Sequence, residues 1–324
     1  EKVDEAVEEL LKQKRLAGAI VVIARKGSIV HFKPYGLMNI ESEKPMASDA
    51  IMRFYSMSKA ITSAGVLMLA ENDKLQVDDP VSKYIPEFNR LMVHSSAGLV
   101  APQREMTIAD LLRHTAALTY GGSGIPAIDD AHRLTNVLGE SSTITDMCRK
   151  LADIPLAYQP GQDWHYGVAI DVLGRVIEVA SEKSLDQFFA DRIFVPLDMT
   201  DTGFYVPVEK HDRFAQVYNS DSKGGLTIGD NTGRADFSKP RAFLSGGGGL
   251  VSTARDYLRF LLAIQNGGRL GETRILSKKS VLLMTTDQLP DAVPNIYFGA
   301  QKRIGVGFGF GFSVRNEMSE WDPQ

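Results

Sequence analysis

Apolar and polar residues near the N-terminus follow first a helical and then a strand pattern. Residues 3–11 carry apolar side chains at helical spacing, which predicts an amphipathic first helix. Two β-rich runs at 19–24 and 28–32 then flank residues 25–27, and β-rich runs around a glycine-containing turn predict a hairpin. We therefore expect the N-terminal region to be a helix laid on antiparallel sheet.

The pattern changes to helical stretches joined by long loops between about residues 75 and 236. Examples of helical spacing are found at 107–114 and 169–180. Thr107 and Asp110 fit a variant of the capping box at the start of the first of these helices. This middle region is predicted to be a mostly helical insertion.

Strand patterns return towards the C-terminus. A glycine run at 246–249 leads into a short strand at 250–253 and then a helix at 254–265. Residues 305–314 alternate glycine with apolar residues, which indicates a strand that another backbone approaches closely. Sheet is thus expected to resume at the C-terminal end.

The most informative short motif is Ser56-Met57-Ser58-Lys59. Residues 51–55 before it read as a short apolar strand, and residues 60–70 after it read as a helix that is apolar nearly all round and therefore buried. If Ser56 opens this helix, Lys59 lies on the same face one turn later. Burial disfavours the charged form of a lysine, and a neutral amine can act as a general base. The alternative is that Ser56 only caps the helix while Lys59 extends to solvent.

A second match to the same serine and lysine spacing occurs at residues 220–223. It lies in the polar, glycine-rich run 219–225, which contains turn residues and has no apolar periodicity. We read it as a solvated loop, and Ser56 remains the candidate nucleophile.

Composition narrows the possible functions. The chain has 324 residues, of which 44% are hydrophobic and 23% charged, as in soluble globular proteins of one large domain or two. The formal net charge is -4, and no tract rich in lysine and arginine occurs, which argues against a nucleic-acid partner. A small neutral or weakly polar molecule is the partner we expect.

Cysteine and histidine usage points to chemistry without a metal. Cys148 is the only cysteine, so no intrachain disulfide and no cysteine cluster can form. The six histidines show no metal-binding spacing, and we expect neither a metal nor another cofactor.

No segment of the sequence is suited to a membrane. No stretch approaches the roughly 20 apolar residues that span a bilayer. Residues 1–5 are mostly charged and unlike a signal peptide, which favours a cytoplasmic location. Because the chain begins with Glu, a removed signal peptide and hence a periplasmic or secreted protein stay open.

Tyr166 is the candidate for a third catalytic group. A serine and lysine pair usually needs a further group that relays a proton to the leaving group, and a tyrosine next to a lysine suits that task. Tyr166 follows the turn at 159–163 and precedes the helix that starts near Ala169, at a junction where side chains can face a cleft. The alternative is a packed tyrosine whose hydroxyl is only hydrogen-bonded.

Together these motifs resemble the serine β-lactamase and penicillin-binding-protein superfamily, and within it the family VIII carboxylesterases related to class C β-lactamases. The matching segments occur in the family's order and cover most of the chain, namely 54–61, 111–115, 160–174 and 245–257. The resemblance implies an α/β (α+β) fold with an antiparallel sheet flanked by helices. Residues 1–74 plus 237–324 would form this α/β domain, and residues 75–236 an inserted, mostly helical domain.

The resemblance also implies an acyl-enzyme mechanism. By position, Ser56 is the nucleophile and Lys59 its base partner. Tyr166 helps to deprotonate Ser56 and protonates the leaving alkoxide, after which water attacks the acyl-enzyme. The oxyanion is held by the backbone N–H of Ser56 and by a second N–H from a facing strand.

Val168 departs from the family pattern. Where β-lactamases of this class carry Tyr-x-Asn, this chain reads Tyr166-Gly167-Val168. An apolar group therefore replaces the side-chain amide that grips the amide of a β-lactam, and such a site loses selectivity for amides while it still accepts hydrophobic esters. The expected function is a serine carboxylesterase acting on small or short-chain esters.

Five residues are expected to contact the substrate: Tyr120, Trp164, His165, Val168 and Gly247. Tyr120 and Trp164 are expected to line or support the acyl pocket. His165 is a candidate partner of Tyr166, with a structural histidine as the alternative. The glycine run around Gly247 lacks the Gly-Lys-Ser/Thr of a phosphate loop and is read as tight backbone packing at a strand entrance.

Other functions stay open on the same residues: a β-lactamase or D-Ala-D-Ala peptidase, an acyltransferase, and a catalytically inactive penicillin-binding-like sensor. The sensor is suggested by the family's third motif, a Lys-Thr-Gly or Trp-x-Gly strand, which should follow residues 308–314. The sequence instead ends with Trp321-Asp322-Pro323-Gln324, and we expect the chain to be incomplete there. The presence of Ser56, Lys59 and Tyr166 argues against the sensor.

Overall fold

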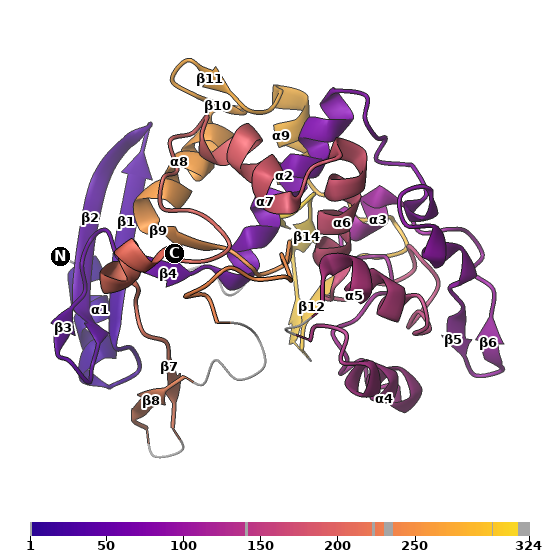
Figure 1. The fold of residues 1–324 in the computed structure, drawn as a ribbon, viewed down its shortest axis with the longest axis horizontal. Helices are drawn as coiled ribbons and strands as arrows, with labels where there is room; N and C mark the ends of the chain where they lie inside the picture. Colours follow the sequence, from indigo (N-terminus) through magenta and orange to yellow (C-terminus); the bar gives the residue numbers. More distant parts are fainter. Residues whose placement is uncertain (1, 140–141, 222–223, 230–235, 300, 317–324) are drawn as a thin grey trace.

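The N-terminal segment forms the predicted helix and hairpin. In the computed structural model, α1 (Lys2–Lys12) is followed by β1 (Gly18–Arg25) and β2 (Ser28–Asn39), which pair antiparallel. The two-residue turn Lys26-Gly27 has φ values of 50° and 77°, as a tight hairpin with right-handed twist requires. β3 (Lys44–Pro45) pairs with β2 and completes the three-stranded sheet at the left of Figure 1.

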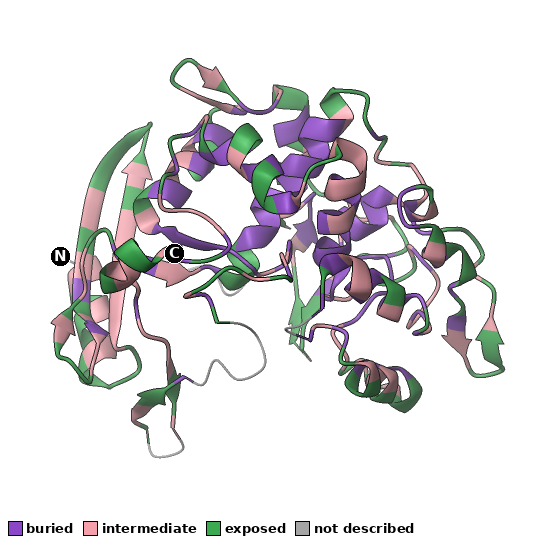
Figure 2. Cartoon of the chain, in the orientation of Figure 1, coloured by how far each residue is buried: buried purple, intermediate pink, exposed green. Residues whose placement is uncertain are grey.

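The structure describes residues 2–139, 142–221, 224–229, 236–299 and 301–316. Its central element is α2 (Ser58–Glu71), in which every residue from Ser58 to Leu69 is buried, as the nearly all-round apolar pattern predicted. Figure 2 shows the buried segments concentrated on this helix and on the helices around it. Ser56 does not open α2 itself but lies in a 3-10 turn, Tyr55–Met57, directly before it.

The middle of the chain is mostly helical and surrounds α2 on one side (Figure 1). Its α-helices are α3 (Ile108–Leu112), α4 (Pro126–Thr135), α5 (Ile144–Leu151), α6 (Ala169–Ser181) and α7 (Leu185–Phe189), the last continued by a π-helical turn at Ala190–Phe194. Shorter 3-10 turns occupy Val81–Lys83, Pro86–Arg90 and Val208–Arg213. The division into residues 1–74 plus 237–324 and residues 75–236 stays a prediction.

Local sequence signals in this region have the expected geometry. Thr107 and Asp110 form a capping box at α3, where the N–H of Thr107 donates to the Asp110 carboxylate at 3.0 Å. Two small hairpins were not predicted, because strands of three residues carry too little periodicity to be recognised. They pair β5 (Val93–Ser95) with β6 (Gly98–Val100) and β7 (Tyr218–Ser220) with β8 (Leu226–Ile228).

The C-terminal region returns to strands and helices. β9 (Val251–Thr253) pairs antiparallel with β4 (Ile51–Arg53) and leads into α8 (Ala254–Gln265), with the bounds predicted for that helix. The remaining elements are the pair β10 (Arg269–Leu270) and β11 (Thr273–Arg274), α9 (Lys278–Thr285), the pair β12 (Ile296–Phe298) and β13 (Gln301–Arg303), and the pair β14 (Val306–Phe308) and β15 (Ser313–Arg315).

The single strand predicted at 305–314 is wrong, because this segment folds back on itself as the β14 and β15 hairpin. Gly311, with a φ of +101°, makes the reversal possible. The close backbone approach predicted for these glycines is confirmed. A Cβ on Gly309 would lie 2.2 Å from the carbonyl oxygen of Met284.

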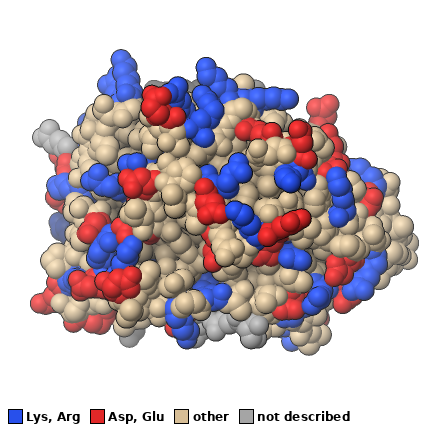
Figure 3. Space-filling view, turned by 45° about the horizontal axis from the view of Figure 1, so that its top comes forward, with Lys and Arg blue, Asp and Glu red and all other residues tan. Residues whose placement is uncertain are grey.

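The surface carries charges of both signs. Figure 3 shows lysine and arginine side chains interspersed with aspartate and glutamate over the face in view. Among the described residues, no helix combines the length and apolar character needed to cross a bilayer.

Gly309→Ala is expected to lower the free energy of unfolding by about 1–3 kcal/mol, because the added methyl group meets backbone rather than a movable side chain. Urea denaturation measures this change. Gly203→Ala is the matched control, since its Cβ would make only an ordinary 3.7 Å contact, and its effect should stay within about 0.5 kcal/mol. Equal effects of the two substitutions would contradict the expectation.

Candidate active site

Ser56 lies where a two-stranded ribbon meets the central helix. β4 and β9 bring the segment before Ser56 against the glycine-rich segment that precedes β9. The N–H of Phe54 donates to the Leu250 carbonyl at 2.9 Å, and the N–H of Leu250 donates to Ser58 Oγ at 3.1 Å. Ser56 itself is exposed, so its hydroxyl is accessible to a substrate.

The backbone just before Ser56 is strained. Tyr55 has a φ of +43°, in the left-handed region that residues other than glycine rarely adopt. Such strain costs about 1–3 kcal/mol and is typical of functional sites, where the surrounding structure enforces it. Here the Phe54 and Leu250 hydrogen bond on one side and α2 on the other fix the turn that presents Ser56.

Lys59 is buried beside Ser56. Its side chain reaches back one helical turn, so that Nζ donates to Ser56 Oγ at 3.2 Å. The same nitrogen donates to Tyr120 Oη at 3.2 Å and to the Gly247 carbonyl at 2.6 Å. Because Lys59 is only 5% exposed, these three acceptors replace water around the three N–H bonds of its ammonium form. The alternative in which Lys59 extends to solvent does not occur.

Tyr166 lies at the entrance of α6 with its ring towards Lys59. Nζ of Lys59 is 4.7 Å from the ring centroid, within the range of a cation–π interaction. Gly167 allows this placement, because a Cβ there would lie 2.0 Å from the Leu118 carbonyl oxygen. Within the described part of the chain, the Tyr166 hydroxyl makes no hydrogen bond and is therefore available to a substrate.

Tyr120 has a more direct role than sequence reasoning gave it. It was expected to line or support the acyl pocket, yet its hydroxyl is the tyrosine hydroxyl that hydrogen-bonds Lys59. Its ring centroid is 6.2 Å from that of Tyr166, so the two tyrosines flank the lysine together. Tyr120 also donates to a carboxylate oxygen of Asp171 at 3.4 Å.

Asp171 is a component of the site that sequence reasoning missed. It lies in the first turn of α6, is 2% exposed, and receives the hydroxyl of Ser245 and the N–H of Gly247, the latter at 3.0 Å. The available signal was its place in the strongly apolar run at 169–180, where a charged side chain is buried only with partners.

The histidine that packs on Tyr166 is His114 rather than His165. The ring centroids of His114 and Tyr166 are 4.9 Å apart, and His114 also contacts Trp164 and Phe308. Burial, followed by the nearby Lys59 charge, lowers the pKa of His114 well below its usual value of 6.5. In the described structure neither ring nitrogen has a hydrogen-bond partner, so His114 is a neutral ring under the tyrosine.

The other residues expected to contact substrate lie at different depths. Gly247 and Tyr120 both line the cleft, Gly247 through its backbone and Tyr120 through its side chain. Trp164 is 3% exposed and packs behind Tyr166, and Val168 is 0% exposed within the main core. His165 is half-buried, and its N–H donates to the His114 carbonyl at 3.0 Å. Trp164, His165 and Val168 therefore support the cleft from behind its wall.

A cleft of about 250 Å³ opens above Ser56. One wall is the glycine-rich backbone, and the rest is mainly aromatic and apolar. Its lining consists of Tyr55, Ser56, Tyr120, Leu138, Tyr166, Asp171, Phe237, Arg241, Phe243, Ser245, Gly247 and Gly248.

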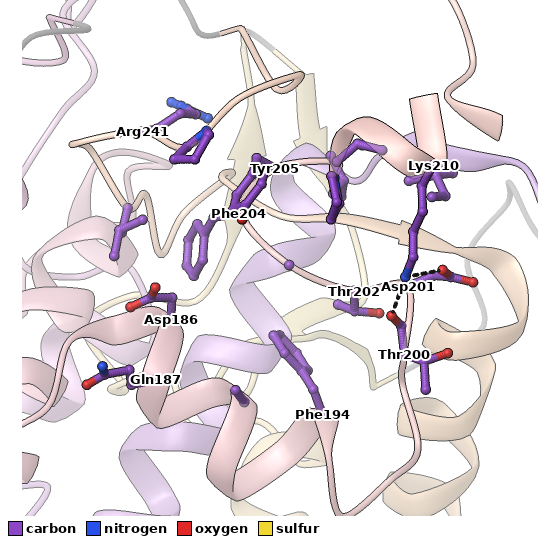
Figure 4. A pocket seen from close by; sticks show the side chains of 18 residues that line it. Asp186, Gln187, Phe194, Thr200, Asp201, Thr202, Phe204, Tyr205, Lys210 and Arg241 are labelled. Atoms are coloured by element: carbon purple, nitrogen blue, oxygen red, sulfur yellow. Dashed lines mark hydrogen bonds and ion pairs between the residues drawn. The ribbon is translucent and has the colours of Figure 1, made fainter. Parts of the chain in front are cut away.

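A second hollow of about 350 Å³, shown in Figure 4, shares Arg241 with the lining of the cleft. Phe194 and Phe204 give it an apolar floor, and the ion pair of Lys210 with Asp201, 2.8 Å long, lies at its rim. Its lining contains no serine, and its lysine, Lys210, is held by the ion pair with Asp201. The cleft at Ser56 is therefore the better candidate, although it is the smaller space.

Two sequence features fall partly or wholly outside the described residues. In the second serine and lysine match, Ser220 is an exposed residue of β7, whereas Ser222 and Lys223 lie outside the described residues. Residues 317–324, where the third motif was sought, also lie outside them.

Comparisons with known proteins agree with the geometry. The beta-lactamase family profile matches residues 3–321. Esterase EstB of Burkholderia gladioli is 32% identical, over 96% of this chain and 78% of its own length. Protein Rv1367c of Mycobacterium tuberculosis is 33% identical, over 98% of this chain and 80% of its own length.

A solved structure shows the same architecture. EstCE1, described as a hydrolase with promiscuous acyltransferase activity, superposes with a TM-score of 0.79 at 28% identity and covers 97% of this chain and 82% of its own. The predicted β-lactamase-like fold of helices and antiparallel sheets is thereby confirmed.

The buried His114 should make stability fall in mild acid. Below about pH 6.5 the unfolded chain takes up a proton on this histidine while the folded chain does not, so the free energy of unfolding decreases as pH falls. His114→Asn, which tolerates the φ of 61°, should remove up to about 1.4 kcal/mol per pH unit of this slope. Urea unfolding from pH 7.5 to 5 measures both slopes, and identical slopes would contradict a neutral buried His114.

Proposed function

The chain belongs to the beta-lactamase family, whose members include serine hydrolases, and on that premise we propose that it is a serine carboxylesterase that forms an acyl-enzyme on Ser56. The observation that carries the proposal is the buried Lys59 amine, 3.2 Å from the exposed Ser56 hydroxyl. A lysine enclosed in this way meets the geometric requirement for a base, since a candidate base must lie within hydrogen-bond reach of the proton it removes.

Acylation begins with attack of Ser56 Oγ on the ester carbonyl carbon. The serine proton passes to the neutral Lys59 amine, which in that state still donates to the Gly247 carbonyl and to Tyr120. Collapse of the tetrahedral intermediate breaks the bond between carbon and the alcohol oxygen. The Tyr166 hydroxyl, which is free of other hydrogen bonds in the described structure, protonates the departing alkoxide and regains its proton from Lys59.

Deacylation repeats these steps with water. A water molecule gives a proton to the tyrosine and lysine pair as its oxygen bonds to the acyl carbon. The bond between that carbon and Ser56 Oγ then breaks, and Lys59 returns the proton to Oγ, which releases the carboxylic acid. The N–H of Ser56 lies in the first turn of a helical segment, where N–H groups lack intrahelical partners, and it is our candidate for one oxyanion donor.

An ester rather than a lactam is the proposed substrate. The position that carries asparagine in the related β-lactamases is Val168, and it is buried in the core, so this position supplies no side-chain amide to grip a substrate amide. Leu138 and Phe243 give the 250 Å³ cleft an apolar lining suited to a small acyl group. The similarity to an esterase, EstB, supports the same choice.

Transfer of the acyl group to an alcohol is a second candidate on the same chemistry. The specific observation in its favour is the 28% identity to EstCE1, whose description includes promiscuous acyltransferase activity. An alcohol would then replace water in the second half of the reaction. Adding a short alcohol to the ester assay and measuring the new ester separates transfer from hydrolysis.

Ser56→Ala should abolish hydrolysis of p-nitrophenyl butyrate, with a loss of at least about 10³-fold in kcat/KM. Ser220→Ala is the matched control, because Ser220 heads the second serine and lysine match, and its activity should be unchanged. Intact mass after treatment with a fluorophosphonate should show one adduct, absent in Ser56→Ala. Undiminished ester hydrolysis in Ser56→Ala would overturn the proposal, and a stable penicillin adduct with no ester turnover would favour the penicillin-binding alternative.

The two tyrosines should differ in their effect on turnover. Tyr166→Phe removes the proton donor to the leaving group and should lower kcat by about 10²- to 10⁴-fold. Tyr120→Phe removes one hydrogen bond to Lys59 and should cost only about tenfold. Steady-state kinetics on p-nitrophenyl butyrate compare the two variants. A larger loss of kcat in Tyr120→Phe would make Tyr120, not Tyr166, the proton donor to the leaving group.

A further inference from the structure

Asp171 lies next to the candidate catalytic residues but has no place in the reaction described so far. It is 2% exposed in the first turn of α6, with three hydrogen-bond donors directed at its carboxylate. Ser245 Oγ and the N–H of Gly247 donate to Oδ1, and the Tyr120 hydroxyl lies 3.4 Å from Oδ2. A carboxylate held by three donors and removed from water is a fixed negative charge inside the site.

Two short routes connect this carboxylate with Lys59. In the first, Lys59 Nζ donates to the Tyr120 oxygen at 3.2 Å, and the Tyr120 hydroxyl donates to Asp171. In the second, Gly247 donates its N–H to Asp171 at 3.0 Å and accepts Lys59 Nζ on its carbonyl at 2.6 Å. Two of the three acceptors around the lysine nitrogen are therefore groups that Asp171 orients.

The second route requires glycine at position 247. A Cβ on Gly247 would lie 2.4 Å from a carboxylate oxygen of Asp171, closer than any side chain can approach. Ser245 reinforces the arrangement, because its hydroxyl donates to Asp171 and accepts the N–H of Gly248 at 3.0 Å. The Ser245 to Gly248 segment is thus wrapped around the carboxylate, and its position depends on that charge.

The charged groups in the cleft lining are Asp171 and Arg241, and Asp171 is the one connected to Lys59 through shared hydrogen-bond partners. Tyr120 and Tyr166 face the amine, and His114 behind Tyr166 is neutral because burial lowers its pKa. Among the described residues, no carboxylate forms a direct ion pair with Lys59. The buried Cys148 thiol also interacts electrostatically with the Asp171 carboxylate and with Arg175.

We infer that Asp171 is a positioning residue, which through Tyr120 and Gly247 holds the Lys59 amine against Ser56 and stabilises its protonated form. Its negative charge favours the ammonium that appears when Lys59 takes the serine proton, as an opposite buried charge does. Its hydrogen bonds fix the carbonyl and the hydroxyl to which the lysine donates in both protonation states. The role of Asp171 in catalysis rests on the proposed function. Its effect on Lys59 rests on the geometry alone.

Asp171→Asn tests the charge while keeping the shape. Without the negative charge Lys59 loses its proton more readily, so the acid limb of kcat/KM, on which activity rises with pH, should move about one unit to lower pH. The plateau of kcat/KM on p-nitrophenyl butyrate should fall about tenfold as the hydrogen bonds weaken. A lower plateau with an unmoved limb is the result of a merely structural role and would overturn the inference.

A second measurement does not need turnover. Lysines labelled with ¹³C at Cε are titrated by NMR, and the Lys59 resonance is assigned with Lys59→Arg. Its titration midpoint should lie about one pH unit lower in Asp171→Asn than in the unmodified protein. An unchanged midpoint overturns the inference. Failure of the unmodified protein to hydrolyse esters overturns the proposed function instead, while the NMR comparison still decides the role of Asp171.

Matched variants separate charge from folding. Asp256→Asn is the control. Asp256 is also buried, with 4% exposure, and also lies in the first turn of a helix, but its carboxylate accepts the Thr202 hydroxyl at 3.0 Å and has no hydrogen-bond route to Lys59 among the described contacts. It should leave both the limb and the midpoint in place. If Asp171→Asn does not fold, Tyr120→Phe interrupts the first route alone and should move the midpoint in the same direction by a smaller amount. No movement in Tyr120→Phe would then overturn the inference.

Discussion

The structure depends on one constraint, which is that a lysine must be accommodated on a helix that is buried on all sides. Every residue of α2 from Ser58 to Leu69 is buried, and Lys59 lies in its first turn. A buried amine needs acceptors in place of water, and the chain supplies them from segments 61 and 188 residues away. The glycine-rich segment, Tyr120 and Ser56 are thereby all joined to this single group.

Sequence reasoning succeeded where the determinants are local. The serine and lysine spacing, the apolar run of α2 and the capping box at α3 each depend on residues within a few positions of one another. The hairpin turn at Lys26-Gly27 and the bounds of α8 were predictable for the same reason. Short-range geometry is set by backbone sterics and by side-chain spacing, both of which can be read directly from the order of residues.

The rest of the site could not be predicted, because it is made by contacts between distant segments. Tyr120 was expected as a pocket wall, yet it meets a lysine 61 residues earlier and an aspartate 51 residues later. His114 and His165 could not be ranked from sequence, since only the folded chain places His114 under Tyr166. Likewise, Val168 was recognised as an apolar substitution, but its burial depends on how α6 enters the core.

Gly247 in the wall of the cleft, and Gly246 and Gly249 in the same glycine run, limit how this protein can diversify. Added Cβ atoms there would lie 2.8, 2.4 and 2.6 Å from the Ile170 carbonyl, the Asp171 carboxylate and the Ser245 carbonyl. None of these three positions can acquire a side chain without displacing backbone carbonyls or the Asp171 carboxylate. Variation in substrate range is therefore open at Gly248, whose Cβ would make only an ordinary 3.6 Å contact with Tyr55, and at the apolar lining residues Leu138 and Phe243. The cleft thus combines lining positions that are open to evolutionary change with one, Gly247, that is closed to it.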